Sequence, residues 1–126
     1  MVFNTKEGKL TMKYLDHLLT IVIEESSEII KEACKAQRFG MDSKEPGQDL
    51  TNEERIWNEA NDLVGTMELV KSLRGFGGFS REAMEAKQQK IKKFSEISIQ
   101  CGRLEPKEIN KPSSLREYLN VKNSAF

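Results

Sequence analysis

Residues 11–38, TMKYLDHLLTIVIEESSEIIKEACKAQR, are the stretch that decides the fold. The stretch contains neither Gly nor Pro, and Gly40 follows it at the position where a left-handed residue commonly ends a helix. We therefore predict one long helix over Thr11–Arg38. Its apolar residues cover more than one face, so this helix should be buried on two sides. A chain of 126 residues cannot readily bury both sides by itself, and a partner subunit is the simplest source of the second surface.

Two further helix starts carry the spacing of a capping box, in which Ser or Thr is followed three residues later by Glu. Thr51 and Glu54 begin a second helix that we expect to run to about Arg74. Ser114 and Glu117 have the same spacing and predict a short helix in the tail.

Segments rich in Gly and Pro separate these helices. Phe39–Leu50 is predicted as a loop, Gly75–Phe79 breaks the second helix, and Ser80 caps a third helix that ends near Gly102. Residues 1–10 are polar and weakly patterned, and no repeat or strand alternation stands out. The prediction is an all-α helical bundle of two long antiparallel helices, a third helix and a short C-terminal helix, completed by oligomerisation. Residues 1–104 would form the domain and 105–126 a linker and tail.

Composition excludes several classes of protein. Twenty basic side chains balance twenty acidic ones, so a general nucleic-acid binder is not expected. No apolar run approaches the roughly 20 residues that cross a bilayer, and the first residues lack the apolar core of a signal peptide, so we expect a cytoplasmic protein. Cys34 and Cys101 are too few and too widely spaced for a metal knuckle or a disulfide framework.

Acidic residues on the first two predicted helices carry the chemistry. The first helix contains Glu24, Glu25 and Glu28, and the second contains Glu59 and Asp62. Residues three apart on a helix share a face, so each helix presents a pair of carboxylates in one direction. Both pairs are in line with apolar stripes, where an uncompensated charge costs several kcal/mol.

Carboxylates gathered in an apolar stripe require a cation between them. Oxygen ligands without thiolate or imidazole suit hard ions such as Mg²⁺ or Mn²⁺. A ferritin-like di-iron site would need Glu-x-x-His pairs, but the single histidine, His17, does not stand three residues after a glutamate.

The ordered pair of acidic motifs resembles a known family. Glu24-Glu25-x-x-Glu28 followed by Glu59-x-x-Asp62 resembles the EExxE…ExxD signature of the MazG-like, all-α nucleoside triphosphate pyrophosphohydrolases, in the small single-domain version common in bacteriophages. The similarity covers roughly residues 12–95. Many relatives have Glu-Leu-Gly-Asp where this chain has Glu59-Ala-Asn-Asp62, which keeps both acids.

The resemblance implies Mg²⁺-dependent hydrolysis of a nucleoside or deoxynucleoside triphosphate to the monophosphate and pyrophosphate, by attack of water at the α-phosphorus. It implies that Glu25, Glu28, Glu59 and Asp62 are the metal ligands. Glu24 would bind a further ion or orient the attacking water. A homodimer or homotetramer in the cytoplasm, which is the host cytoplasm if the gene is a phage gene, is the expected assembly.

Cationic and aromatic side chains are candidates for contacts with the substrate. Lys87 falls in the apolar stripe of the third helix, where a lysine is otherwise unexpected, and we assign it to the leaving pyrophosphate. Lys90 lies next to that face, and Arg38 stands at the end of the first helix within possible reach of a phosphate. Trp57, close to Glu59, is a candidate for stacking on the base.

Two alternatives stay open at this point. The chain could be a non-catalytic helical module whose carboxylates dock a basic partner or bind a regulatory nucleotide. It could also be a dedicated dUTPase or dCTPase of the same helical superfamily.

Overall fold

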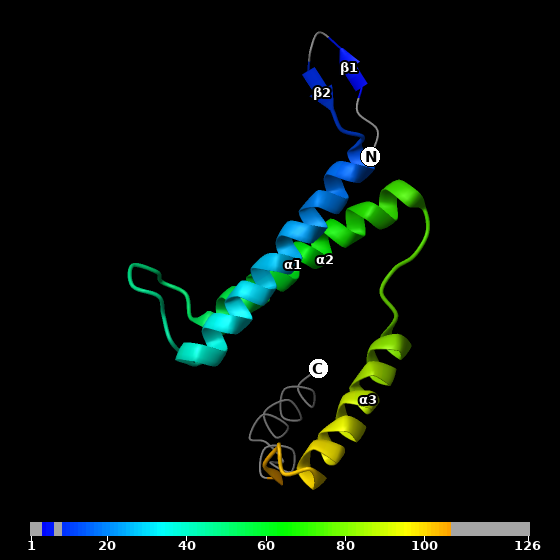
Figure 1. Ribbon diagram of the computed structural model, residues 1–126. Helices are drawn as coiled ribbons and strands as arrows, with labels where there is room; N and C mark the ends of the chain where they lie inside the picture. Colours follow the sequence, from blue (N-terminus) through cyan, green and yellow to red (C-terminus); the bar gives the residue numbers. More distant parts are fainter. Residues whose placement is uncertain (1–3, 7–8, 107–126) are drawn as a thin grey trace, which may run out of the picture. The chain divides into compact units, whose positions relative to one another are not determined.

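The computed structural model describes residues 4–6 and 9–106, and α-helices make up most of that part (Figure 1). The helical body confirms the predicted all-α class. The chain divides into two compact units, Met1–Gly78 and Phe79–Phe126, and each is described by itself. The expected domain boundary after residue 104 falls inside the second unit, and the tail helix expected from Ser114 lies outside the described residues.

A short hairpin that the sequence analysis did not predict precedes the helices (Figure 1). Strand β1 (Asn4–Lys6) pairs antiparallel with β2 (Lys9–Thr11), with Asn4 opposite Thr11. A strand of three residues is too short to show a recognisable alternation of apolar and polar side chains. The polar lead-in is therefore a hairpin, and Thr11 belongs to a strand instead of beginning the first helix.

Helix α1 (Tyr14–Phe39) begins three residues later than expected because the chain is still extended at Lys13. At its other end Gly40 has a φ of 98°, and its N–H donates to the carbonyl of Ala36. The glycine is needed there as expected, but its ψ of 152° lies outside the left-handed helical region.

Helix α2 (Asn52–Arg74) begins with the predicted capping box. The Thr51 hydroxyl accepts a hydrogen bond from the Glu54 N–H at 3.1 Å, and the Thr51 N–H donates to the Glu54 carboxylate at 3.2 Å. The helix ends at Gly75, whose φ of 65° is left-handed, so both predicted ends of α2 are confirmed.

Thr51→Ala should lower the free energy of unfolding by about 1 kcal/mol, because the N–H of Glu54 loses its acceptor at the helix start. Thermal or urea unfolding followed by circular dichroism measures the change. Thr66→Ala is a control within α2, since the Thr66 hydroxyl only bonds back to the carbonyl of Asp62 in the helix interior. An equal loss for the two variants would contradict a capping role for Thr51.

Helices α1 and α2 lie side by side and run in opposite directions (Figure 1). Few apolar side chains are fully enclosed between them: Leu18 and Ala36 are buried, while Ile23 is 69% exposed and Ile30 is 65% exposed. The second buried side expected for α1 is therefore not supplied by α2. Within the described residues, none of the helices combines the length and the apolar character needed to cross a membrane.

The loop that joins α1 to α2 is tied to the ends of both helices. The Asn52 side chain donates to the Gly40 carbonyl at 2.8 Å, and the backbone N–H of Asn52 donates to the Ser43 carbonyl at 2.9 Å. Asn52 is buried. These bonds fix the connection at one end of the helix pair.

Helix α3 (Arg81–Gln100) belongs to the second unit. The Ser80 hydroxyl accepts from the Ala83 N–H at 3.1 Å, so the predicted cap is confirmed, and Gly102 with a φ of 71° stands at the predicted end. The chain turns there because the N–H groups of Arg103 and Leu104 both donate to the Ser98 carbonyl.

Candidate metal centre

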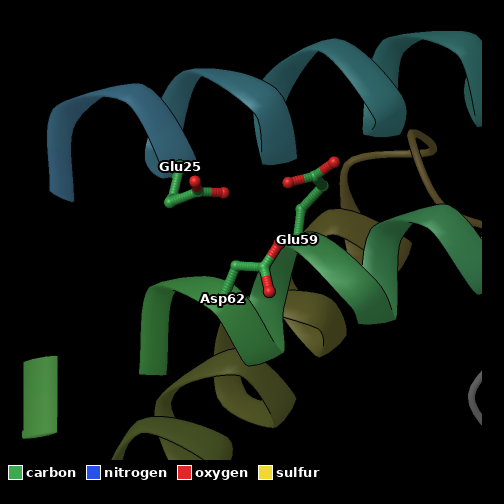
Figure 2. A group of neighbouring side chains, drawn as sticks. All are labelled: Glu25, Glu59 and Asp62. Atoms are coloured by element: carbon green, nitrogen blue, oxygen red, sulfur yellow. The ribbon is translucent and has the colours of Figure 1, made fainter. Parts of the chain in front are cut away.

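Three carboxylates from the two paired helices converge on one point (Figure 2). Glu25 comes from α1, and Glu59 and Asp62 come from consecutive turns of α2. One oxygen from each of the three lies within 4.8 Å of the others. The spacing of three residues places Glu59 and Asp62 on one face of α2, and the antiparallel packing brings that face to Glu25.

The convergence leaves Glu25 in an unfavourable electrostatic environment. Its Oε2 is buried and has no hydrogen-bond partner among the residues that the structure describes. A hydrogen bond with the Glu59 carboxyl raises the pKa of Glu25, and burial and the negative charges of Glu59, Asp62 and Glu24 raise it further. The two carboxyl groups repel each other when both are ionised. With both groups ionised, a cation is the natural partner for the orphaned oxygen.

The donor set fits a hard divalent cation. All three groups offer oxygen, and Asp62 is exposed, so solvent or an anionic ligand has access to one side of the cluster. Mg²⁺ characteristically keeps several waters and takes few protein carboxylates together with substrate phosphates. Glu25, Glu59 and Asp62 would hold such an ion.

The other two acidic residues of the predicted site lie nearby but outside the cluster. Glu28, one turn after Glu25, forms an ion pair of 3.6 Å with Lys31, and both side chains are about half exposed. Glu24 is exposed, and its charge is one of the causes that raise the pKa of Glu25. The structure therefore brings together three of the four predicted metal ligands.

Arg38 and Trp57 are not brought to the carboxylates within this helix pair. Arg38 follows Glu25 by thirteen residues of α1, which is about 20 Å of helix, and its guanidinium stacks on Phe39 at 5.1 Å. Trp57 is 63% exposed and stands two residues before Glu59, a spacing that places two side chains on different faces of a helix. The stacking role of Trp57 therefore stays a prediction.

Lys87 and Lys90 lie on α3 in the second unit. Both line a hollow of about 490 Å³ along one face of that helix, which Phe94 and Arg103 also line. Arg103 was not predicted as a site residue. It follows the turn at Gly102, where its N–H donates to the Ser98 carbonyl, and the sequence pattern did not reveal this turn's effect on the hollow.

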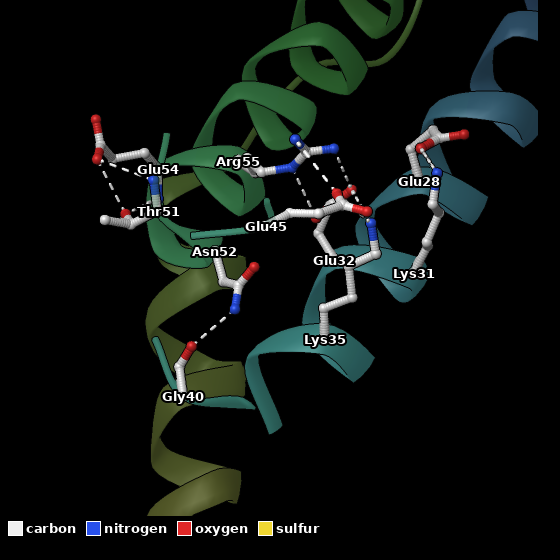
Figure 3. Close-up of polar contacts among 10 residues, drawn as sticks. All are labelled: Glu28, Lys31, Glu32, Lys35, Gly40, Glu45, Thr51, Asn52, Glu54 and Arg55. Carbon is white, nitrogen blue, oxygen red and sulfur yellow. Dashed lines mark hydrogen bonds and ion pairs between the residues drawn. The ribbon is translucent and has the colours of Figure 1, made fainter. Parts of the chain in front are cut away.

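A charged network that the sequence analysis missed lies along the same interface between α1 and α2 (Figure 3). The Arg55 guanidinium donates to both oxygens of Glu32, from Nε at 3.0 Å and from Nη2 at 3.1 Å. Lys35 lies 3.8 Å from Glu32 and 3.1 Å from Glu45. The sequence carried one signal of this network. Glu32 stands one turn from the predicted metal ligand Glu28, and Arg55 stands one turn from the predicted metal ligand Glu59.

Comparison of the chain with protein families, with curated proteins and with solved structures finds no match.

Proposed function

We propose that the chain is a metal-dependent nucleoside triphosphate pyrophosphohydrolase of the MazG-like kind. The observation that carries the proposal is the convergence of Glu25, Glu59 and Asp62, where one buried carboxylate oxygen of Glu25 has no hydrogen-bond partner within residues 4–6 and 9–106. A site of oxygen donors open to solvent on one side suits a substrate that itself supplies phosphate oxygens.

The proposed roles of the acidic residues follow from their positions. Glu25, Glu59 and Asp62 would hold Mg²⁺, or Mn²⁺ in its place, and Glu28, which pairs with Lys31 in the structure, would be the fourth ligand. Such an ion neutralises phosphate charge and lowers the pKa of a bound water when it is present. Glu24, beside the cluster and exposed, orients the water that attacks the α-phosphorus.

The proposed contacts with the rest of the substrate come from basic and aromatic residues. Lys87 and Lys90, which line one hollow together with Arg103, provide a concentration of positive charge suited to the pyrophosphate product. We also propose that Arg38 contacts a phosphate of the substrate and that Trp57 stacks on the base.

We propose that the enzyme is a homodimer or homotetramer that acts in the cytoplasm on a nucleotide pool. Exposed apolar side chains on α1, above all Ile23 and Ile30, support an assembly in which a second copy covers the outer face of this helix.

Wild-type protein should release pyrophosphate from at least one natural NTP or dNTP in the presence of Mg²⁺. Activity should disappear with EDTA and return with excess Mg²⁺ or Mn²⁺, because the carboxylates alone cannot neutralise the triphosphate. A pyrophosphate-coupled colorimetric assay over all eight nucleotides measures this. Strong preference for dUTP or dCTP would identify the specialised pyrimidine enzyme, and no turnover of any nucleotide would contradict the proposal.

The same preparation separates the enzyme from a non-catalytic docking module. If the carboxylates only dock a basic partner, the protein should have the same melting temperature with and without Mg²⁺. If the carboxylates form the proposed metal centre, Mg²⁺ or Mn²⁺ should raise the melting temperature of the protein, because an ion that binds the folded state stabilises it.

A further inference from the structure

We propose that Arg55 and Glu32 are positioning residues for the carboxylate centre: their two-pronged ion pair fixes α1 against α2 in the one register that brings Glu25 opposite Glu59 and Asp62. This inference deepens the proposed function and rests on it for its effect on catalysis. The register itself can be measured without reference to any activity.

The ion pair is the most deeply enclosed polar contact described between the two helices. The Glu32 side chain is 0% exposed, and Arg55 is 20% exposed. Both carboxylate oxygens of Glu32 are engaged, one by Nε of Arg55 and the other by Nη2, so the two planar groups meet edge to edge (Figure 3). Such a fork tolerates little sliding or rotation.

The positions of the pair connect it directly to the carboxylates. Glu32 follows Glu25 by seven residues, two turns further on the same side of α1. Arg55 precedes Glu59 by four residues, one turn earlier on the same side of α2. In an antiparallel pair, a contact between Glu32 and Arg55 therefore sets which residues of α2 lie opposite Glu25.

A slip of one residue between the helices would separate Glu32 from Arg55 and would also separate Glu25 from Glu59. One residue corresponds to about 1.5 Å along the axis and about 100° around it. The contact of Glu32 with Arg55 would break, and Glu25 would turn away from Glu59. The apolar contacts specify the register poorly, because few apolar side chains between α1 and α2 are buried.

Arg55 is suited to positioning and not to binding substrate. Two of its nitrogens are used by Glu32, and its Nη1 lies 3.9 Å from Glu45 of the connecting loop. Hydrogen bonding to Glu32 raises the pKa of Arg55, and the charges of Glu32, Glu45 and Glu59 raise it further. The guanidinium is thus surrounded by acids of its own chain and stays charged.

The test compares Arg55→Lys with Thr51→Ala. Arg55→Lys keeps the positive charge but loses the fork, whereas Thr51→Ala weakens the start of α2 and leaves the ion pair intact. All measurements are made at a temperature where circular dichroism finds each variant folded. A second variant, Glu32→Leu with Arg55→Met, removes the pair without leaving a buried charge, so it should stay folded.

The register is read from the distance between spin labels on Cys34 of α1 and on an introduced Ser72→Cys of α2, with Cys101→Ser as background. Labelled chain is diluted with unlabelled chain so that distances within one chain dominate. We expect a narrow distribution for wild type and Thr51→Ala, and a shift of about 1.5 Å or more, or a clear broadening, for Arg55→Lys and the double variant. Unchanged distributions in those two variants would overturn the proposal.

The effect of the variants on the carboxylate centre is measured as their affinity for Mn²⁺ and as separate changes in kcat and KM. Arg55→Lys should bind Mn²⁺ about 10-fold to 100-fold more weakly, and at saturating metal it should lose kcat while KM changes little. Wild-type affinity and kcat in Arg55→Lys, or an equal loss in Thr51→Ala, would also overturn the proposal. If wild type itself binds no Mn²⁺ and hydrolyses nothing, the proposed function fails, and the spin-label distances still decide the register.

Discussion

Glu25→Gln should lower kcat by about 10³-fold or more while leaving the metal-free protein at least as stable as wild type. Losing one charged ligand removes several kcal/mol of charge stabilisation in the transition state, and each 1.36 kcal/mol corresponds to a factor of ten in rate. The same change relieves repulsion among Glu25, Glu59 and Asp62 and gives the buried position an N–H donor.

Two measurements check this pair of effects. The coupled assay gives kcat at saturating Mg²⁺, and thermal unfolding with and without Mg²⁺ gives the stability. We expect Mg²⁺ to raise the melting temperature of wild type and not that of Glu25→Gln. Glu68→Gln, which removes an exposed carboxylate from the same helix as Glu59, is the matched control and should behave as wild type. Full activity in Glu25→Gln would rule out the carboxylate centre as the site of reaction.

Arg55→Met should lower the free energy of unfolding by about 2–4 kcal/mol, the largest loss we expect from a single substitution in the helix pair. Removing one partner of a buried ion pair leaves the other charge unpaired, at a cost of about 3–5 kcal/mol when both are enclosed. The partial exposure of Arg55 and the neighbouring Lys35 reduce that cost here. Urea unfolding measures the change.

Lys31→Met is the matched control, since it also removes a cation from an ion pair with a glutamate of α1. The pair of Lys31 with Glu28 is about half exposed on both sides, so its loss should cost less than about 1 kcal/mol. Equal losses for Arg55→Met and Lys31→Met would show that the pair with Glu32 has no special weight. The double variant of Glu32→Leu with Arg55→Met should recover most of the stability.

The ion pair between Arg55 and Glu32 makes the free energy of unfolding depend on pH. The hydrogen bond from Arg55 holds the pKa of Glu32 below its usual range, and the charges of Arg55, Lys35 and Lys31 act in the same direction against the effect of burial. A lowered folded pKa stabilises the protein above the unfolded value of about 4.3, and this contribution is lost as the pH falls below it. Between about pH 5 and pH 3, wild type should therefore lose more stability than Glu32→Gln.

Local signals predicted the helix boundaries well because capping is decided by neighbouring residues. The Thr51 and Glu54 box and the Ser80 cap occur where they were expected, since each depends on side chains within one turn. Helix periodicity likewise placed Glu59 and Asp62 on one face. The pairing of residues 4–6 with residues 9–11 was missed because strands of three residues carry almost no pattern.

Contacts between helices could not be predicted in the same way. Which residues of α2 face Glu25 depends on the length of the connecting loop and on its bonds through Asn52. The pairing of Glu32 with Arg55 spans 23 residues and has no local signature. For the same reason the stacking role of Trp57 stays a prediction, because its closeness to Glu59 along the chain does not determine what its side chain contacts.

Diffraction from crystals grown with Mn²⁺ and a non-hydrolysable triphosphate, collected for anomalous scattering, tests the central claim most directly. We expect an anomalous peak about 2–2.3 Å from carboxylate oxygens of Glu25, Glu59 and Asp62, with phosphate oxygens completing the coordination. A manganese peak elsewhere on the chain, or none in crystals that hold the nucleotide, would contradict it.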